Sequence, residues 1–172
     1  VTVVGSDPVC ADRLQPWTSA GRCRFEAVNL QSMPYPDQSF DAVVCLRLLP
    51  HSVSWTGLIR ELCRVARRSV VVDYPSLRSA NILSSQLFAM KRGIELNTRR
   101  FMTFSPRDIH AAFAACGFVV RAERAQFLIP MVVHRLVNQA FFSRAVEIPG
   151  RMAGLTRWLG SPIIARADRR TS

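Results

Sequence analysis

The sequence NLQSMPYPDQSFDAVV, residues 29–44, decides the fold. Pro34 and Pro36 restrict the backbone and predict a stiff loop. Asp37-Gln-Ser39 is typical of a turn, and Phe40 begins an apolar run that predicts a buried strand. The stretch therefore predicts a rigid loop that leads from one strand of a sheet into the next.

The segments on either side of this loop predict further strands. The predicted strands cover residues 2–6, 24–30, 40–49 and 69–73. The last two are nearly continuous apolar runs, which favour parallel strands covered on both faces. A helix is predicted between them, with Trp55, Leu58, Ile59, Leu62 and Val65 on its apolar side and Arg60, Glu61 and Arg64 on its polar side. A strand, a helix and a second buried strand form a βαβ unit, which predicts a right-handed crossover.

The second half of the chain continues this alternation. Ser105-Pro106-Arg107-Asp108 is a capping box with proline at the first helical position, and it predicts a helix that Gly117 stops. Three more elements are predicted: a strand from Phe118, a helix over 133–145, and a short strand over 161–165 before a basic tail, 166–172. We therefore expect one α/β domain over residues 1–172, with a helical insertion at about 129–159.

The composition narrows the classes of function. The net charge is +11, and Lys91 is the one lysine among 23 basic residues. This balance favours an anionic partner such as nucleic acid or an acidic lipid surface, but the arginines are scattered, and a compositional bias explains them equally well. Five cysteines without a C-x-x-C pair argue against a disulfide framework and against zinc. We expect no metal, and a reducing, cytoplasmic setting.

The segment MPYPDQSFDAVV, from Met33 to Val44, resembles a motif of the class I S-adenosylmethionine-dependent methyltransferases, in the small-molecule group that includes quinone-biosynthesis enzymes. The resemblance keeps good register from Val1 to Asp73 and continues more loosely to Arg166. It implies a Rossmann-like, mostly parallel sheet with flanking helices, and S-adenosyl-L-methionine as the cofactor.

The resemblance also implies a set of cofactor-binding residues. In the family, an acidic residue at a strand end accepts hydrogen bonds from the cofactor ribose, and Asp7 matches it. Asp7 equally suits a helix cap for the segment after Pro8. The position that receives the adenine amino group falls on Asn29, whose side-chain oxygen accepts that hydrogen bond without a charge. The implied cofactor-binding residues are Asp7, Pro8, Asn29, Leu30, Cys45 and Leu46.

Two residues are candidates for the acceptor side. His51 follows the strand over 40–49, where this family often has a histidine; it suits a general base for a substrate hydroxyl, or else packing or capping at a helix entry. Tyr74 ends a strand and either lines the acceptor pocket or belongs to a strand-end turn. Methyl transfer to an anionic or soft nucleophile depends mainly on positioning, so the lack of a clear catalytic pair does not oppose the assignment.

Two features depart from the family pattern. The glycine-containing turn that usually follows the long helix is replaced by Ala66-Arg67-Arg68-Ser69. No glycine-rich cofactor loop exists among the eight glycines, and the residues from Val1 onward already predict a strand. We therefore expect a chain truncated at its amino terminus, without the family's first strand. Two other strands would lack a neighbour between them, and the chain alone would bind cofactor poorly.

Three functions stay open at this point. The first is methyl transfer to a small or lipid-like acceptor by the parent domain, because residues 127–159 interleave apolar and arginine side chains as in a lid or at an anionic membrane surface. Ordinary helices packed on the sheet explain that segment as well. The second is a nucleic-acid methyltransferase or binding module, for which no recognition motif is found. The third is a non-catalytic relic of the fold. We expect the first, in a cytoplasmic protein that is soluble or peripheral to the membrane.

Overall fold

The computed structural model describes residues 1–77, 102–127 and 161–170 of the chain. Strands and helices alternate there, so the chain is an α/β protein, as predicted. The elements are β1 (Thr2–Gly5), η1 (Pro8–Leu14), α1 (Gln15–Ser19), β2 (Arg24–Ala27), β3 (Phe40–Cys45), η2 (Leu49–His51), α2 (Trp55–Val65), β4 (Ala66–Tyr74), α4 (Pro106–Ala115), β5 (Phe118–Phe127) and β6 (Ser161–Arg169). The predicted insertion over 129–159 and the predicted helix over 133–145 lie outside the described residues.

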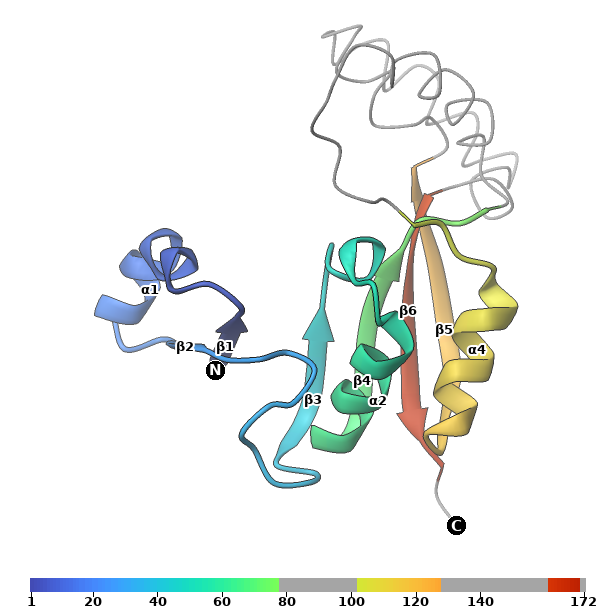
Figure 1. Cartoon of the computed structure of the whole chain (residues 1–172), viewed down its shortest axis with the longest axis horizontal. Coiled ribbons are helices and arrows are strands. Elements are labelled where there is room, and N and C mark those ends of the chain that lie inside the picture. The colour runs from blue at the N-terminus through green and yellow to red at the C-terminus, as the bar shows by residue number, and fades with distance from the viewer. Residues whose placement is uncertain (78–101, 128–160, 171–172) are drawn as a thin grey trace, which may run out of the picture.

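The described strands form two separate sheets. β1 and β2 run parallel as a pair, with Thr2 opposite Arg24. The second sheet has the order β3-β4-β6-β5, in which β3 and β4 run parallel and β6 runs antiparallel to both of its neighbours. The β1–β2 pair lies on the side of the open edge of β3 (Figure 1). The fold is therefore parallel at its amino-terminal side and mixed at its carboxyl-terminal side.

β1 and β3 each keep one unpaired edge among the described residues. β1 pairs with β2 alone and β3 with β4 alone, so a row of backbone N–H and C=O groups stays open on each strand. β3 also exposes apolar surface, since Val44 is 63% exposed. Within the described residues, the unpaired edges agree with the expectation, and whether a strand is missing between β1 and β3 stays a prediction. Such an edge readily accepts another strand.

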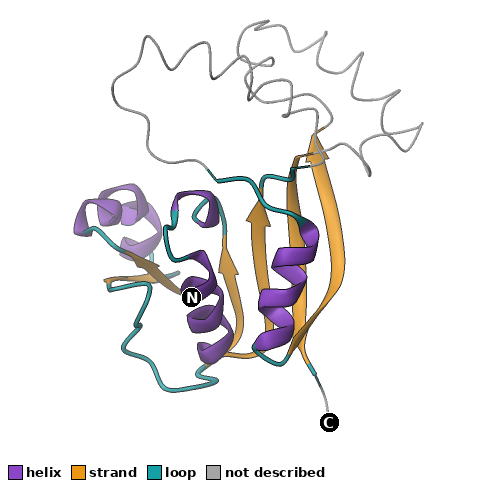
Figure 2. Ribbon diagram, turned by 45° about the vertical axis from the view of Figure 1, so that its right-hand side comes forward, coloured by secondary structure: helices purple, strands orange, loops and turns teal. Residues whose placement is uncertain are grey.

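The core lies between the four-stranded sheet and two helices. α2 and α4 cover one face of that sheet and lie side by side there (Figure 2). The buried side chains include Leu58, Ile59, Leu62, Val65, Val70, Val72, Ile109, Phe113 and Phe118. Each such aliphatic or aromatic side chain stabilises the fold by about 1.5–3 kcal/mol. The predicted apolar side of α2 is confirmed, but Glu61, expected on the polar side, is only 9% exposed.

Several element boundaries differ from those predicted. β2 ends at Ala27 rather than at residue 30, because Asn29 begins a turn. β3 ends at Cys45 rather than at residue 49, because Arg47 takes a φ of +58° and the strand cannot continue through it. α2 leads directly into β4, so Ala66–Ser69, expected in a loop, forms the beginning of the strand.

The last strand is longer than the sequence suggested. β6 extends to Arg169, so residues 166–169 belong to the sheet and not to a basic tail. Ala167 is fully buried, whereas Arg166 and Asp168 on either side of it pair with each other. The residues alternate with the two-residue period of a strand. The sequence showed little sign of this period, because the buried positions hold small alanines and the positions between them hold charged residues.

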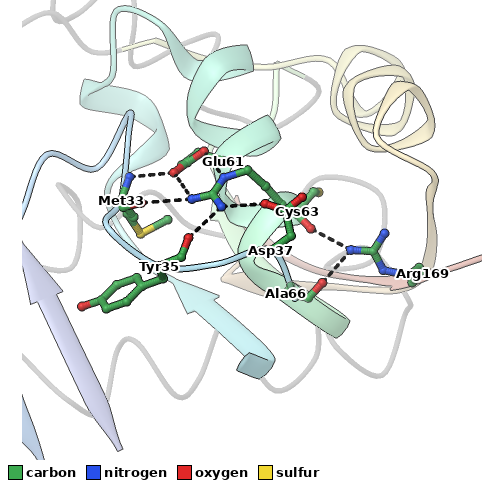
Figure 3. Close-up of polar contacts among 8 residues, drawn as sticks. Met33, Tyr35, Asp37, Glu61, Cys63, Ala66 and Arg169 are labelled. Atoms are coloured by element: carbon green, nitrogen blue, oxygen red, sulfur yellow. Dashed lines mark hydrogen bonds and ion pairs between the residues drawn. The ribbon is translucent and has the colours of Figure 1, made fainter. Parts of the chain in front are cut away.

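Arg169 stabilises the junction at which α2 becomes β4. Its Nη2 donates to the carbonyl oxygens of Cys63 at 3.0 Å and Ala66 at 2.7 Å, and its Nε donates to that of Arg67 at 3.1 Å. Figure 3 shows the guanidinium at this helix end. The same group lies 4.7 Å from the ring centroid of Phe118. A cation here binds carbonyls that the helix leaves open and interacts favourably with the negative end of the helix dipole.

We expect Arg169→Met to lower the free energy of unfolding by about 1–2 kcal/mol, because carbonyls at the helix end lose their charged donor. Urea unfolding at neutral pH measures the change. Arg68→Met, which alters an exposed arginine at the beginning of β4, serves as the control and should change the value by less than about 0.5 kcal/mol. Equal losses in the two variants would contradict a specific role for Arg169.

Candidate functional site

A pocket lies where β1 and β2 end. Its volume is about 500 Å³, and it is lined by Ser6, Ala27, Val28, Asn29, Leu30 and Gln31. β1 ends at Gly5 and β2 at Ala27, and because the two strands are parallel their carboxyl ends meet at one edge. Ligands of open α/β sheets bind at this edge. The structure thus brings together two of the predicted cofactor residues, Asn29 and Leu30.

Asp7 follows β1 and caps the next element. Its Oδ1 accepts a hydrogen bond from the backbone N–H of Val9 at 3.0 Å, and Asp7 is the N-cap residue of η1. Pro8 is the first residue of that 3₁₀ helix. The side chain is exposed, beside Ser6 of the pocket lining. The capping role considered from the sequence is therefore present, and a second role toward a ribose stays a prediction.

The loop after β2 holds Asn29 in a compact turn. Asn29 Oδ1 accepts the N–H of Gln31 at 3.0 Å, and the carbonyl oxygen of Asn29 accepts the N–H of Ser32 at 3.1 Å. Gln31 Nε2 donates to Ser52 Oγ at 3.2 Å and to the carbonyl oxygen of Ser54 at 3.3 Å. Ser54 is the N-cap residue of α2. The pocket loop is therefore tied to the beginning of that helix.

Cys45 and Leu46 lie at the end of β3. Cys45 is 7% exposed, and burial, together with the neighbouring Asp73 carboxylate, raises the pKa of its thiol to about 12. This thiol stays protonated at neutral pH. Leu46 is 52% exposed. Asp73 accepts the backbone N–H of Arg47 through Oδ1, which holds Arg47 in its left-handed conformation at the strand end. Neither Cys45 nor Leu46 lines the pocket beside β1 and β2.

The two acceptor-side candidates differ in exposure. His51 ends η2, its side chain is exposed, and its backbone N–H donates to the carbonyl oxygen of Leu48 at 3.0 Å. Tyr74, the last residue of β4, is fully buried, and its hydroxyl donates to Glu123 Oε1 at 2.6 Å. Burial and that carboxylate raise the pKa of Tyr74. The structure thus places Tyr74 in the core, and the role of each residue toward an acceptor stays a prediction.

An ion pair between Glu61 and Arg64 anchors the proline-containing loop to the last turn of α2 (Figure 3). Glu61 Oε1 accepts the backbone N–H of Met33 at 2.6 Å. Arg64 Nη2 donates to the Met33 carbonyl oxygen at 3.0 Å, and Nη1 donates to the Tyr35 carbonyl oxygen at 2.7 Å and to Asp37 Oδ1 at 2.8 Å. Both backbone groups of Met33 are therefore held by charged side chains.

The same loop also contacts β2. The Tyr35 hydroxyl donates to Glu26 Oε2 at 2.6 Å, and burial followed by this hydrogen bond raises the pKa of Tyr35 to about 12. Its ring packs edge-on against Phe40 with centroids 5.0 Å apart. The loop therefore touches β2 through Tyr35 and α2 through Met33.

Sequence reasoning missed the Glu61–Arg64 pair. Acidic and basic residues three positions apart on a helix are ordinary on an exposed side, and their mutual spacing carries no sign of a distant partner. The one available signal was that Glu61 follows the buried positions Leu58 and Ile59 within one turn. That signal indicates a residue near the boundary of the core, where an ionised carboxylate needs hydrogen-bond donors.

Comparison with solved structures shows the fold. A magnesium protoporphyrin IX methyltransferase from Synechocystis PCC 6803 with bound SAH matches with a TM-score of 0.57 and 17% identity, over 93% of this chain and 57% of that one. The 4+2 cyclase SpnF matches with a TM-score of 0.63 and 18% identity, over 99% and 67%. A SAM-dependent methyltransferase from Methanosarcina mazei matches with a TM-score of 0.62 and 13% identity, over 100% and 82%. No curated protein matches the sequence.

A sequence model of a protein family matches the amino-terminal part of the chain. This model, described as a methyltransferase domain, matches residues 2–72. The chain therefore resembles the class I methyltransferases in its fold and, over residues 2–72, in its sequence. It spans just over half the length of the protoporphyrin methyltransferase that it resembles. No helix within the described residues is long and apolar enough to cross a membrane. Those residues also hold no group of three or more His, Cys, Asp or Glu side chains arranged for a metal ion.

The pH dependence of stability should depend on Glu61. The hydrogen bonds from Arg64, and then the N–H of Met33, hold the pKa of Glu61 below its usual value of 4.5. The ionised Glu61 carboxylate stabilises the fold fully at pH values above the pKa that Glu61 has in the unfolded chain. This stabilisation is lost as the pH falls through the lower pKa that Glu61 has in the folded chain. Glu61→Gln should therefore be less stable than the wild type at pH 7, with the gap closing as the pH falls below 4.5 through the lower folded pKa of Glu61.

Urea midpoints across that pH range test this expectation. Asp12→Asn, at an exposed carboxylate of η1, is the control and should follow the wild-type curve. A gap between wild type and Glu61→Gln that stays constant with pH would contradict the assignment of this stabilisation to the ionised carboxylate.

Proposed function

We propose that this chain forms the adenosine-facing part of a methyltransferase that transfers a methyl group from S-adenosyl-L-methionine to a small or lipid-like acceptor. The pocket at the carboxyl ends of β1 and β2, within the segment that matches a methyltransferase domain model, supports the proposal most directly. When bound, the cofactor supplies a methyl group on a sulfonium centre. The residues of this chain would hold and orient its adenosine part.

The lining of the pocket fits an adenosine group. Val28 and Leu30 provide apolar surface for a purine ring. The carboxamide oxygen of Asn29 has two lone pairs, so it can accept the adenine amino group while it retains the N–H of Gln31. A carboxylate oxygen of Asp7 beyond the one that caps η1 would accept the ribose hydroxyls. Leu30 offers its backbone N–H to the ring edge.

We extend the proposal to the gap between the sheets. A further parallel strand, ending in a glycine-rich loop, would pair with the open edges of β1 and β3 and would complete the site. We propose that residues outside this sequence supply it. The open edges support this idea because each presents the backbone groups that such a strand would bind.

The acceptor is proposed to be small or lipid-like, approached from the side of His51 and β4. His51 would serve as a general base toward an acceptor hydroxyl. The residues proposed to cover a greasy acceptor or to contact an anionic membrane, 127–159, lie almost entirely beyond the described part of the chain. The buried, protonated thiol of Cys45 supports methyl transfer by positioning rather than through a covalent enzyme intermediate at that residue.

Isothermal titration calorimetry with S-adenosylhomocysteine tests the proposal. The DNA upstream of the Val1 codon is first sequenced, and the chain is produced with and without the residues encoded there. We expect an open frame encoding a strand and a glycine-rich loop, micromolar binding by the extended chain, and at least tenfold weaker binding by residues 1–172 alone. A stop codon immediately upstream would favour the alternative that the chain is a non-catalytic relic of the methyltransferase fold. Extended chains without heat of binding would contradict the proposed cofactor.

Asn29→Asp is expected to tighten binding of S-adenosylhomocysteine by roughly 3- to 10-fold, because an ionised acceptor makes a stronger hydrogen bond to the adenine amino group. Calorimetry on the extended chain measures the change, and Asn29→Ala should weaken binding. Gln15→Glu, which adds the same charge at an exposed position of α1, controls for a general electrostatic effect. If Gln15→Glu tightens binding as much as Asn29→Asp does, the proposed adenine contact is wrong.

A further inference from the structure

We propose that Arg64 and Glu61 are positioning residues for the adenosine pocket. They hold the loop from Asn29 to Met33 in the place where its polar groups meet the ligand. This inference rests on the proposed function for the identity of the ligand, but the positioning of the loop is a separate physical claim.

The loop is anchored to one helix at two points. Gln31 donates to Ser52 and to the carbonyl oxygen of Ser54, at the beginning of α2. Met33 is bound through both of its backbone groups by Glu61 and Arg64 at the other end of the same helix. α2 therefore acts as a rigid frame for the pocket loop. Asn29 and Leu30 lie in the pocket lining directly before the first anchor.

The hydrogen bonds of Arg64 indicate that this side chain positions the pocket loop and does not bind the ligand itself. A guanidinium has five N–H donors. Nε donates to Glu61 Oε2 at 2.9 Å, and Nη2 donates to Glu61 Oε1 at 2.7 Å and to the Met33 carbonyl oxygen. Nη1 donates to the Tyr35 carbonyl oxygen and to Asp37. All five donors are thus used within the protein, and none remains for a cofactor or an acceptor.

The backbone of Arg64 strengthens the same attachment. Its carbonyl oxygen accepts the N–H of Gln38 at 2.8 Å, and Gln38 takes a φ of +56° in the turn before β3. Lysine could not reproduce this set of contacts, because it has three donors on one nitrogen and no planar fork. The arrangement therefore requires arginine at position 64 and an acceptor with two oxygens at position 61.

A displaced loop would change recognition of the purine edge before it changed the fold. The carboxamide oxygen of Asn29 accepts hydrogen from an amino group, whereas the 6-oxo group of hypoxanthine offers none. A site built around such a hydrogen bond rejects a ligand that lacks the donor, and displacement of the site removes this discrimination. The preference for an adenosyl over an inosyl ligand therefore reports the position of Asn29.

The first test measures that preference by calorimetry. S-adenosylhomocysteine and S-inosylhomocysteine are titrated into wild type, Arg64→Met and Arg64→Lys, in the chain length that binds the adenosyl compound. We expect the wild type to prefer the adenosyl ligand by at least about tenfold and the preference in Arg64→Met to fall toward one. Arg64→Lys should stay closer to Arg64→Met than to wild type. Partial unfolding would lower the bound fraction of both ligands equally and leave their ratio of affinities unchanged.

The matched control is Arg67→Met. Arg67 follows α2 by two residues and pairs with Asp41 on the exposed surface, away from the pocket loop. This variant should keep both affinities and their ratio. A full wild-type preference in Arg64→Met, or an equal loss in Arg67→Met, would overturn the proposal.

The second test does not depend on the ligand. Amide hydrogen exchange followed by NMR reports the protection of the N–H groups of Gln31 and Met33, which donate to Asn29 and Glu61. We expect at least tenfold faster exchange at both amides in Arg64→Met and no change in Arg67→Met. If no chain length binds the adenosyl ligand, the proposed function fails, and unchanged exchange in Arg64→Met would independently overturn the positioning claim.

Discussion

The ion pair of Glu61 and Arg64 is the interaction on which the arrangement of the pocket depends. Two sheets that share no hydrogen-bonded strand are connected through the loop that this pair holds. Tyr35 extends the connection to β2 by its hydrogen bond to Glu26. Burying an ion pair has a desolvation cost. Here both carboxylate oxygens of Glu61 accept hydrogen bonds and all five N–H donors of Arg64 have partners. Removing one partner would leave the other charge uncompensated at the edge of the core.

Much of the sheet could be predicted from the sequence because its apolar runs have the composition of buried parallel strands. β1, β3 and β4 follow such runs, and the apolar side of α2 follows its helical spacing. The resemblance to the methyltransferases also led us to expect two strands with unpaired edges, and β1 and β3 each keep one such edge within the described residues.

The remaining features depend on contacts between residues distant in the sequence. Glu61 is buried because the backbone of Met33 reaches it, and neither residue signals the other. The length of β6 was underestimated because Ala165 and Ala167 bury little surface and because Arg166 was interpreted as the beginning of a basic tail. Asn29 and Leu30 were assigned by resemblance; both line the pocket, and their role toward a cofactor stays a prediction. Cys45 and Leu46 belong to the other sheet and do not line that pocket.

The net charge suggested an anionic partner, but several arginines of this chain bind groups of the protein itself. Arg64 and Arg169 direct their donors to backbone carbonyls and carboxylates of the protein, and Arg166 is paired with Asp168. A phosphate contact requires an arginine whose donors face outward, because counterion release and hydrogen bonding both depend on direct approach. Part of the charge of +11 is therefore carried by side chains whose donors are used inside the protein. This use of arginine weakens the argument from net charge for a nucleic-acid partner.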